Sequence, residues 1–229
     1  MRAWPVVLVI MLAQLVLAQP IMLVASSGET LTGAVVEVEK LDGERQVFTV
    51  GPEGVIVVRE VPLGILRVRV ISWKGVPIDY RCLVTPLNTT IRVPAIHRFT
   101  VNVVGARRQG LADATVRILH EGREIERGVT DASGTYKTLL PAASYTVVAE
   151  YGGRAGEQRV EVVGPTEVTL QLDIFGEIGG LPISTGEFML MIALLALIPL
   201  VLFVIAYEYA QWRRKRVLRV VAPAVEKGG

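Results

Sequence analysis

The residues of this sequence whose types could carry out chemistry are few and lie far apart. The two histidines, His97 and His120, have no Cys, Asp or Glu at the spacing of a metal site. Asp131 and Ser133 lie close together, but the dense run of oxygen ligands that a calcium loop needs is absent around them. No Ser-His-Asp set, glycine-rich phosphate loop or paired-carboxylate motif stands out. We therefore predict no catalytic, cofactor-binding or metal-binding residues and expect a protein that is not an enzyme.

Asn88 begins a short motif that marks a modification site. Asn88-Thr89-Thr90 is an N-glycosylation sequon, and it lies in a predicted turn. We therefore interpret Asn88 as a candidate glycosylation site.

The stretch LPISTG, from Leu181 to Gly186, resembles the LPxTG signal of sortases. It has one residue too many between Pro and Thr, and a protease pocket reads side chains at fixed distances along an extended peptide. Transfer to a cell wall is therefore the weaker alternative. The glycines and the proline here favour a flexible stalk over residues 175–187.

Cys82 is the only cysteine, so no intrachain disulfide can form. Period-two alternation places it on the same strand face as Ile78, Tyr80 and Val84. We expect it to pack as a small apolar side chain. An intermolecular disulfide is the alternative.

The N-terminus has the pattern of an export signal. Arg2 precedes an apolar run that ends in small residues at Ala18, and cleavage is expected between Ala18 and Gln19. The run from Pro5 to Leu17 is shorter than the roughly 20 residues that a bilayer crossing needs. Residues 1–18 are therefore predicted to be a cleaved signal peptide, with an uncleaved anchor as the alternative.

A second apolar run near the C-terminus is long enough to span a membrane. Residues 188–207 carry no charge, and a helix of that length covers about 30 Å, the thickness of the hydrocarbon layer. A basic cluster follows the run, whereas Glu177 and Glu187 precede it, so the tail at residues 208–229 should be cytoplasmic. The residues that determine this topology are Arg213, Arg214, Lys215, Arg216 and Arg219.

The charge of the protein is unevenly distributed. The net charge is +2, yet residues 19–187 hold 17 basic and 20 acidic side chains, against 6 and 2 in residues 208–229. A nucleic-acid-binding protein would carry its positive charge on the folded domain. We therefore expect the lipid bilayer and a protein at the cell surface as partners, and no nucleic acid.

The region between the apolar ends contains an internal repeat. VGPEGVIV, from Val50 to Val57, aligns with TDASGTYK, from Thr130 to Lys137, and places Gly54 on Gly134. A repeat of this length indicates two homologous modules, at residues 19–96 and 97–174.

Each module reads as short alternating strands separated by turn signals, which predicts a seven-stranded β-sandwich. In the second module the expected strands are 98–104, 114–120, 123–129, 134–139, 144–151, 157–163 and 166–173. The predicted fold class is all-β, with two tandem sandwiches and one C-terminal transmembrane helix.

The second module resembles the carboxypeptidase regulatory-like family. The resemblance rests on Ala112-Asp113-Ala114, on the turn from Thr130 to Gly134, and on Pro141 before Tyr145. It spans residues 98–173 and extends more weakly over residues 21–95. The resemblance implies a transthyretin-like, Ig-like sandwich that serves as a non-catalytic accessory module.

These observations lead to one functional hypothesis and an alternative from another class. The hypothesis is a type I membrane-anchored surface protein that presents two Ig-like modules for protein interaction or envelope structure. The alternative is an accessory, ligand-binding subunit of a membrane transporter or surface hydrolase.

Overall fold

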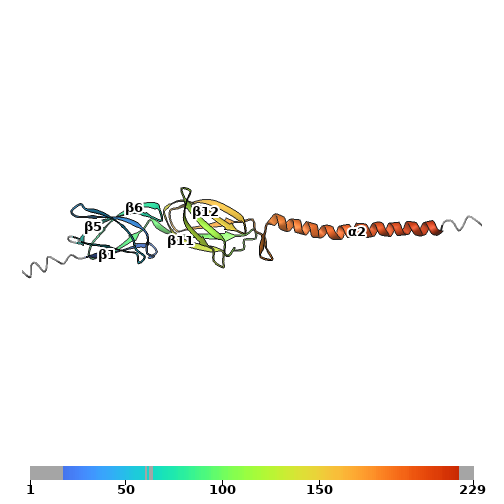
Figure 1. The fold of residues 1–229 in the computed structure, drawn as a ribbon, viewed down its shortest axis with the longest axis horizontal. Helices are drawn as coiled ribbons and strands as arrows, with labels where there is room; N and C mark the ends of the chain where they lie inside the picture. The colour runs from blue at the N-terminus through green and yellow to red at the C-terminus, as the bar shows by residue number, and fades with distance from the viewer. Residues whose placement is uncertain (1–17, 60, 62–63, 222–229) are drawn as a thin grey trace, which may run out of the picture. The chain divides into compact units, whose positions relative to one another are not determined.

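The computed structural model describes residues 18–59, 61 and 64–221. The predicted signal peptide lies outside the described residues except for Ala18. The chain divides into two compact units, with the boundary between Leu172 and Asp173. The first unit contains two β-sandwich modules, and the second contains a small hairpin and a long helix (Figure 1).

Module 1 consists of seven strands in two sheets. One sheet has the order β3-β2-β5-β6 and the other the order β4-β1-β7. The strands are β1 (Gln19–Ala25), β2 (Val35–Lys40), β3 (Arg45–Thr49), β4 (Val55–Val58), β5 (Leu66–Trp73), β6 (Val76–Val84) and β7 (Thr90–Val93).

Module 2 repeats this topology strand for strand. Its sheets have the orders β10-β9-β12-β13 and β11-β8-β14. In both modules the first strand pairs antiparallel with the fourth and parallel with the seventh. The strands are β8 (Ile96–Val104), β9 (Thr115–His120), β10 (Arg123–Val129), β11 (Thr135–Pro141), β12 (Ala143–Tyr151), β13 (Arg154–Val162) and β14 (Thr166–Gln171).

The predicted all-β fold class is confirmed, and the seven strands expected in module 2 are all present within a few residues of their predicted bounds. The expected module boundary at residue 97 falls just inside β8, which begins at Ile96. Only Pro94 and Ala95 separate β7 from β8, so no flexible linker joins the modules.

Strand alternation builds the core of each sandwich. In β2, Val36 and Val38 are buried, whereas the alternating residues Glu37 and Glu39 face outward. Burial of each such valine contributes about 1.5–3 kcal/mol. Because the two sheets turn their apolar faces toward each other, Ile21 of β1 and the β2 valines belong to one hydrophobic cluster.

The turn before β11 is built by the side chain of Asp131. Its Oδ1 accepts hydrogen bonds from the backbone nitrogens of Ser133 (2.9 Å) and Thr135 (3.0 Å). The Ser133 hydroxyl and these two amides hold the pKa of the Asp131 carboxyl below its usual range. The amide of Gly134 closes the turn on the Asp131 carbonyl at 2.9 Å. Asp131 is therefore a turn-forming residue.

The second unit departs from the expected stalk. Residues 175–187 form the hairpin of β15 (Gly176–Ile178) and β16 (Leu181–Ile183) and the first turn of α2 (Thr185–Val221). Gly179 and Gly180 both have positive φ, as a two-residue hairpin turn requires. The helix also begins three residues before the predicted span, because Ser184 and Glu187 cap its start.

Candidate functional site

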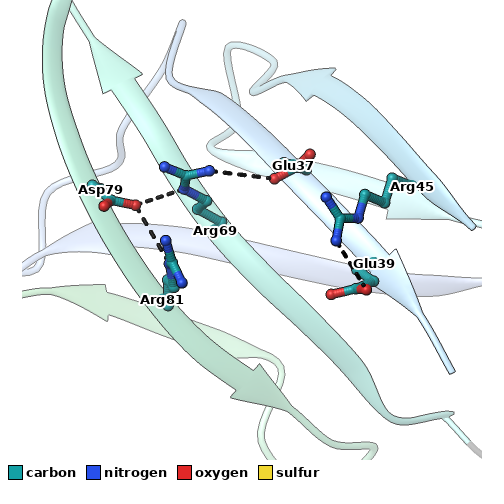
Figure 2. A network of polar contacts seen from close by, with 6 residues as sticks. All are labelled: Glu37, Glu39, Arg45, Arg69, Asp79 and Arg81. Atoms are coloured by element: carbon teal, nitrogen blue, oxygen red, sulfur yellow. Dashed lines mark hydrogen bonds and ion pairs between the residues drawn. The ribbon is translucent and has the colours of Figure 1, made fainter. Parts of the chain in front are cut away.

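The outward face of the sheet β3-β2-β5-β6 carries a network of ion pairs (Figure 2). Arg69 is at its centre: Nε donates to Oδ1 of Asp79 at 2.6 Å, and Nη1 lies 3.9 Å from Oε2 of Glu37. Nε of Arg81 lies 3.5 Å from the same Asp79 oxygen. We call this surface the charged array; its residues are Glu37, Glu39, Arg45, Arg67, Arg69, Asp79 and Arg81.

Strand register brings these charges together. Glu37 lies opposite Arg69 and Glu39 opposite Arg67 across β2 and β5, while Arg45 faces Glu39 from β3. Nη2 of Arg45 lies 3.4 Å from Oε1 of Glu39. The array was not predicted from the sequence, although the alternations Val-Glu-Val-Glu and Arg-Val-Arg-Val indicate charged residues on one strand face. Opposite charges on neighbouring strands are the favourable cross-strand pairing.

The array contributes little to folding stability, because every one of its ion pairs includes a solvent-exposed arginine. The hydrogen bond from Arg69 lowers the pKa of Asp79, which keeps that carboxylate ionised. The array surrounds a shallow hollow of about 680 Å³ that also includes the exposed side chain of Leu83. Arginines beside an apolar side chain are typical of protein-contacting surfaces.

The array belongs to module 1 and is not repeated in module 2. The strand registers identify which positions of module 2 correspond to those of the array. On these strands the inward-facing residues stay apolar, whereas the outward-facing residues differ in charge. In this register, Glu37, Arg45, Arg69 and Arg81 correspond to Arg117, Glu124, Val148 and Glu157. Because the core is kept while the face differs, the two modules present different surfaces.

A lysine at the turn between β5 and β6 connects the modules. Nζ of Lys74 donates to Oγ1 of Thr138 and to the carbonyl oxygen of Leu139, both at 3.1 Å, and pairs with Glu126. The ammonium also lies 4.7 Å from the centre of the Trp73 ring, a cation–π distance. Lys74 and Glu126 are each about one-fifth exposed, so this ion pair is screened less than those of the array.

The module 2 side of the junction is equally well packed. The hydroxyl of Tyr136 donates to Oε1 of Glu126 at 3.0 Å. Burial, followed by the negative charge of Glu126, raises the pKa of Tyr136 to about 12. The Tyr136 ring covers Gly128, where a Cβ would lie 2.0 Å from Cε2 of the ring. Leu139 of β11 joins the hydrophobic cluster of module 1, so the two modules share a continuous core.

A polar groove of about 700 Å³ lies beside this junction. Nδ2 of Asn102 donates to Oε1 of Glu167 at 2.6 Å, and the Thr135 hydroxyl donates to Oδ1 of Asn102 at 3.0 Å. Arg98 and Lys137 add positive charge to the lining. Such a lining suits a small polar ligand better than an apolar one.

The two histidines lie on different strands of module 2. Nδ1 of His120 lies 3.0 Å from the carbonyl oxygen of Ser144, and its ring tilts against Tyr145 with 5.5 Å between centroids. His97 lies in β8. Within the described residues, no three His, Cys, Asp or Glu side chains form a metal-binding group.

Cys82 and Asn88 take up the two environments expected of them. Cys82 is half-buried against the core of module 1, and burial raises the pKa of its thiol. Asn88 is exposed in the turn between β6 and β7, where its backbone nitrogen donates to the Thr85 carbonyl at 3.0 Å. Gln19, the residue after the predicted cleavage point, is the first residue of β1. Cleavage and glycosylation both stay predictions.

The helix α2 is the other functional element. Of the described residues, only Thr185–Arg214 form a helix long and apolar enough to cross a membrane, and its most apolar 18-residue stretch has a mean hydropathy of 3.1 and no buried residue. Arg213 and Arg214 are exposed at its end. Lys215, Arg216 and Arg219 continue the helix, where the structure describes the backbone alone.

No protein-family model matches the sequence, and no curated protein matches it. Among solved structures, the chain is similar to the Bacillus anthracis TIE protein, with 22% identity over 68% of this chain and 33% of that one, at a TM-score of 0.30. For a DUF3823 family protein from Parabacteroides merdae the identity is 19%, over 34% and 45% of the two chains, with a TM-score of 0.30. For the shaft pilin SpaA from Lactobacillus rhamnosus GG, the identity is 10% over 71% of this chain and 100% of that one, with a TM-score of 0.35.

The chain thus spans a third of the TIE protein and less than half of the DUF3823 family protein. Identities and TM-scores this low give no basis for transferring a function, and the resemblance of module 2 to the carboxypeptidase regulatory-like family stays a resemblance.

Proposed function

We propose that this protein is a single-pass membrane protein that holds two rigidly joined β-sandwiches at the cell surface for contact with another protein. The observation that carries this proposal is the exposed apolar surface of α2. Its large apolar side chains from Met189 to Tyr209 are all exposed. A helix that is apolar on all sides requires either a protein core or a lipid environment.

The orientation follows from the residues at the two ends of the span. Arg213 and Arg214 follow the apolar segment, and Glu187 precedes it, which is the distribution of a cytoplasmic C-terminus. The modules are then extracytoplasmic, in agreement with the export signal proposed for residues 1–18.

The charged array is the surface that we assign to partner contact. Its ion pairs add little to stability, it lies on one module alone, and it combines arginines with the exposed Leu83. The resemblance of module 2 to the carboxypeptidase regulatory-like family supports a non-catalytic role for the sandwiches.

Crosslinking in native membranes, followed by mass spectrometry, tests the assignment. The double variant Arg67→Glu/Arg81→Glu reverses two charges of the array on exposed side chains, and Arg159→Glu is the matched control on the corresponding sheet of module 2. We expect crosslinks from module 1 to be lost in the double variant and kept in the control. Equal crosslinking in all three proteins would remove the array from the proposal.

The polar groove beside the junction favours a second candidate, in which the protein is an accessory subunit that binds a small polar ligand. Arg98, Lys137 and Glu167 line this groove. The same crosslinking experiment separates the two functions. A transporter or hydrolase as the dominant partner, unaffected by the array variant, supports the accessory role.

A further inference from the structure

The β15–β16 hairpin is attached firmly to the start of α2. The amide and hydroxyl of Thr185 both donate to Oδ1 of Asp173, at 3.1 and 2.8 Å. The Phe175 ring stacks on Phe188 of the first helical turn, with 4.1 Å between centroids. Attachment on both sides of the hairpin leaves it little freedom to move relative to the beginning of the helix.

The helix start itself is fixed by a reciprocal cap. Oγ of Ser184 accepts from the amide of Glu187 at 3.1 Å, and Oε2 of Glu187 accepts from the amide of Ser184 at 2.7 Å. This is a capping box, which satisfies two otherwise unpaired amides at the point where the helix begins. The position of the hairpin is therefore tied to the depth at which α2 enters the bilayer.

The two faces of the hairpin differ, because only one of them carries a charged side chain. Ile178 lies opposite Leu181 next to the glycine turn, whereas Glu177 lies opposite Pro182 on the other face. Ile178 is 53% exposed and Leu181 is 72% exposed. A pair of three-residue strands has no core of its own, so folding of the hairpin does not account for two large aliphatic side chains at its tip.

The chain that follows indicates what covers these side chains. Phe188 begins the uncharged segment of α2 only seven residues after Leu181. In Figure 1 the hairpin extends sideways from the first turn of the helix. If α2 spans the membrane, an element at this position lies at the boundary between head groups and acyl chains.

We propose that the β15–β16 hairpin is a lipid-contacting foot, whose Ile178 and Leu181 enter the interfacial layer of the outer leaflet. Amphipathic elements in this layer place their apolar face about 5–10 Å into the boundary region. Through the capping box and the Phe175–Phe188 stack, the foot fixes the rotation of α2 in the bilayer. The inference rests on the proposed membrane span.

Site-directed spin labelling of the full-length protein in phosphatidylcholine–phosphatidylglycerol vesicles tests the foot. In a Cys82→Ser background, single cysteines replace Leu181, Glu177, Leu195 in the middle of the apolar segment, and Leu87, which is fully exposed in module 1. Accessibility to oxygen and to a water-soluble nickel chelate then reports the depth of each label. Glu177 is the matched control because it lies on the opposite face of the same hairpin.

The expected order of depth is Leu195, then Leu181, then Glu177 and Leu87. If the Leu181 label is as accessible to the chelate as the Leu87 label while the Leu195 label lies in hydrocarbon, the proposed lipid contact of the foot is overturned. The proposed membrane span then still stands. A Leu195 label in water overturns both proposals. If the Cys82→Ser background does not fold, Leu181→Trp in the wild-type chain replaces it: added fluorescence quenched by brominated lipid supports the foot, and unquenched added fluorescence overturns it.

Discussion

Nζ of Lys74 donates a 3.1 Å hydrogen bond to the carbonyl oxygen of Leu139, and this bond joins a turn of module 1 to a strand of module 2. Leu139 also packs into the core of module 1. The junction thus combines a directional polar contact with apolar burial. The connection between β7 and β8 is only two residues long, which limits the movement of one module relative to the other. Adjacent domains of one chain commonly move relative to each other; here the contacts favour motion of the two modules as one unit.

Replacing Lys74 should uncouple the modules. In Lys74→Met, Glu126 keeps its bond from Tyr136 but loses its cation, and an unpaired charge that is largely buried costs about 1–3 kcal/mol. We expect the unfolding transition measured by circular dichroism in urea to shift to lower denaturant and to broaden or split. Arg92→Met, on an exposed position of β7, is the control. A single transition at the wild-type midpoint for Lys74→Met would contradict the coupling.

Tyr136 should make the protein sensitive to alkali. Its pKa rises from 10.0 to about 12 on folding, so the folded state holds the proton more tightly than the unfolded state. This contribution to stability is complete below about pH 10 and is lost as pH rises toward 12. Thermal unfolding midpoints between pH 8 and pH 12 should fall less steeply in Tyr136→Phe than in the wild type. Parallel curves for the two proteins would show that Tyr136 does not contribute.

Gly134 should be far less tolerant of alanine than Gly153, although both have positive φ. At Gly134, φ is +79° and an added Cβ would lie 2.6 Å from the backbone nitrogen of Leu111. At Gly153, φ is +76° and nothing lies within 4 Å. Gly153→Ala therefore measures the backbone strain alone, about 1–2 kcal/mol. Gly134→Ala adds a clash with backbone and should lower the free energy of unfolding by clearly more. Equal losses in chemical denaturation would show that the Gly134 turn can shift.

Replacing Arg69 should change the pKa of Asp79 and leave the stability of the fold almost unchanged. Because its ion pairs are exposed, Arg69→Gln is expected to leave the thermal midpoint close to the wild-type value. The pKa of Asp79 should rise toward its ordinary value, because the Arg69 hydrogen bond that lowers it is removed. NMR titration of the Asp79 carboxyl carbon measures this shift. A large loss of stability would instead make the array a structural element.

The sequence was sufficient for the fold of the modules. Apolar residues alternate in β2 and β5, and Gly54 repeats as Gly134, because each strand must bury one face and each turn needs a residue that tolerates positive φ. These requirements are local, because each depends on residues that are neighbours in the sequence. The apolar segment in α2 was found for the same reason, since its signal is a continuous run.

The sequence was misleading between Phe175 and Glu187. Glycine and proline favoured a flexible stalk, yet Ser184 and Glu187 had the spacing of a capping box and Gly179-Gly180 the composition of a hairpin turn. Flexible and tightly turned segments share their composition. The stacking of Phe175 on Phe188, which holds the hairpin in place, joins residues whose contact no local pattern specifies.

The strands, their repeat and the apolar helix could be predicted from the sequence, because they depend on periodicity and length. Three relationships appear only in the folded protein: Glu37 lies beside Arg69, Lys74 bonds to Leu139, and Ile178 and Leu181 are exposed near the start of α2. Each of these relationships depends on strand register or on packing between segments distant in the chain. Register is set by the sum of many weak core contacts, and no single stretch of sequence contains that sum.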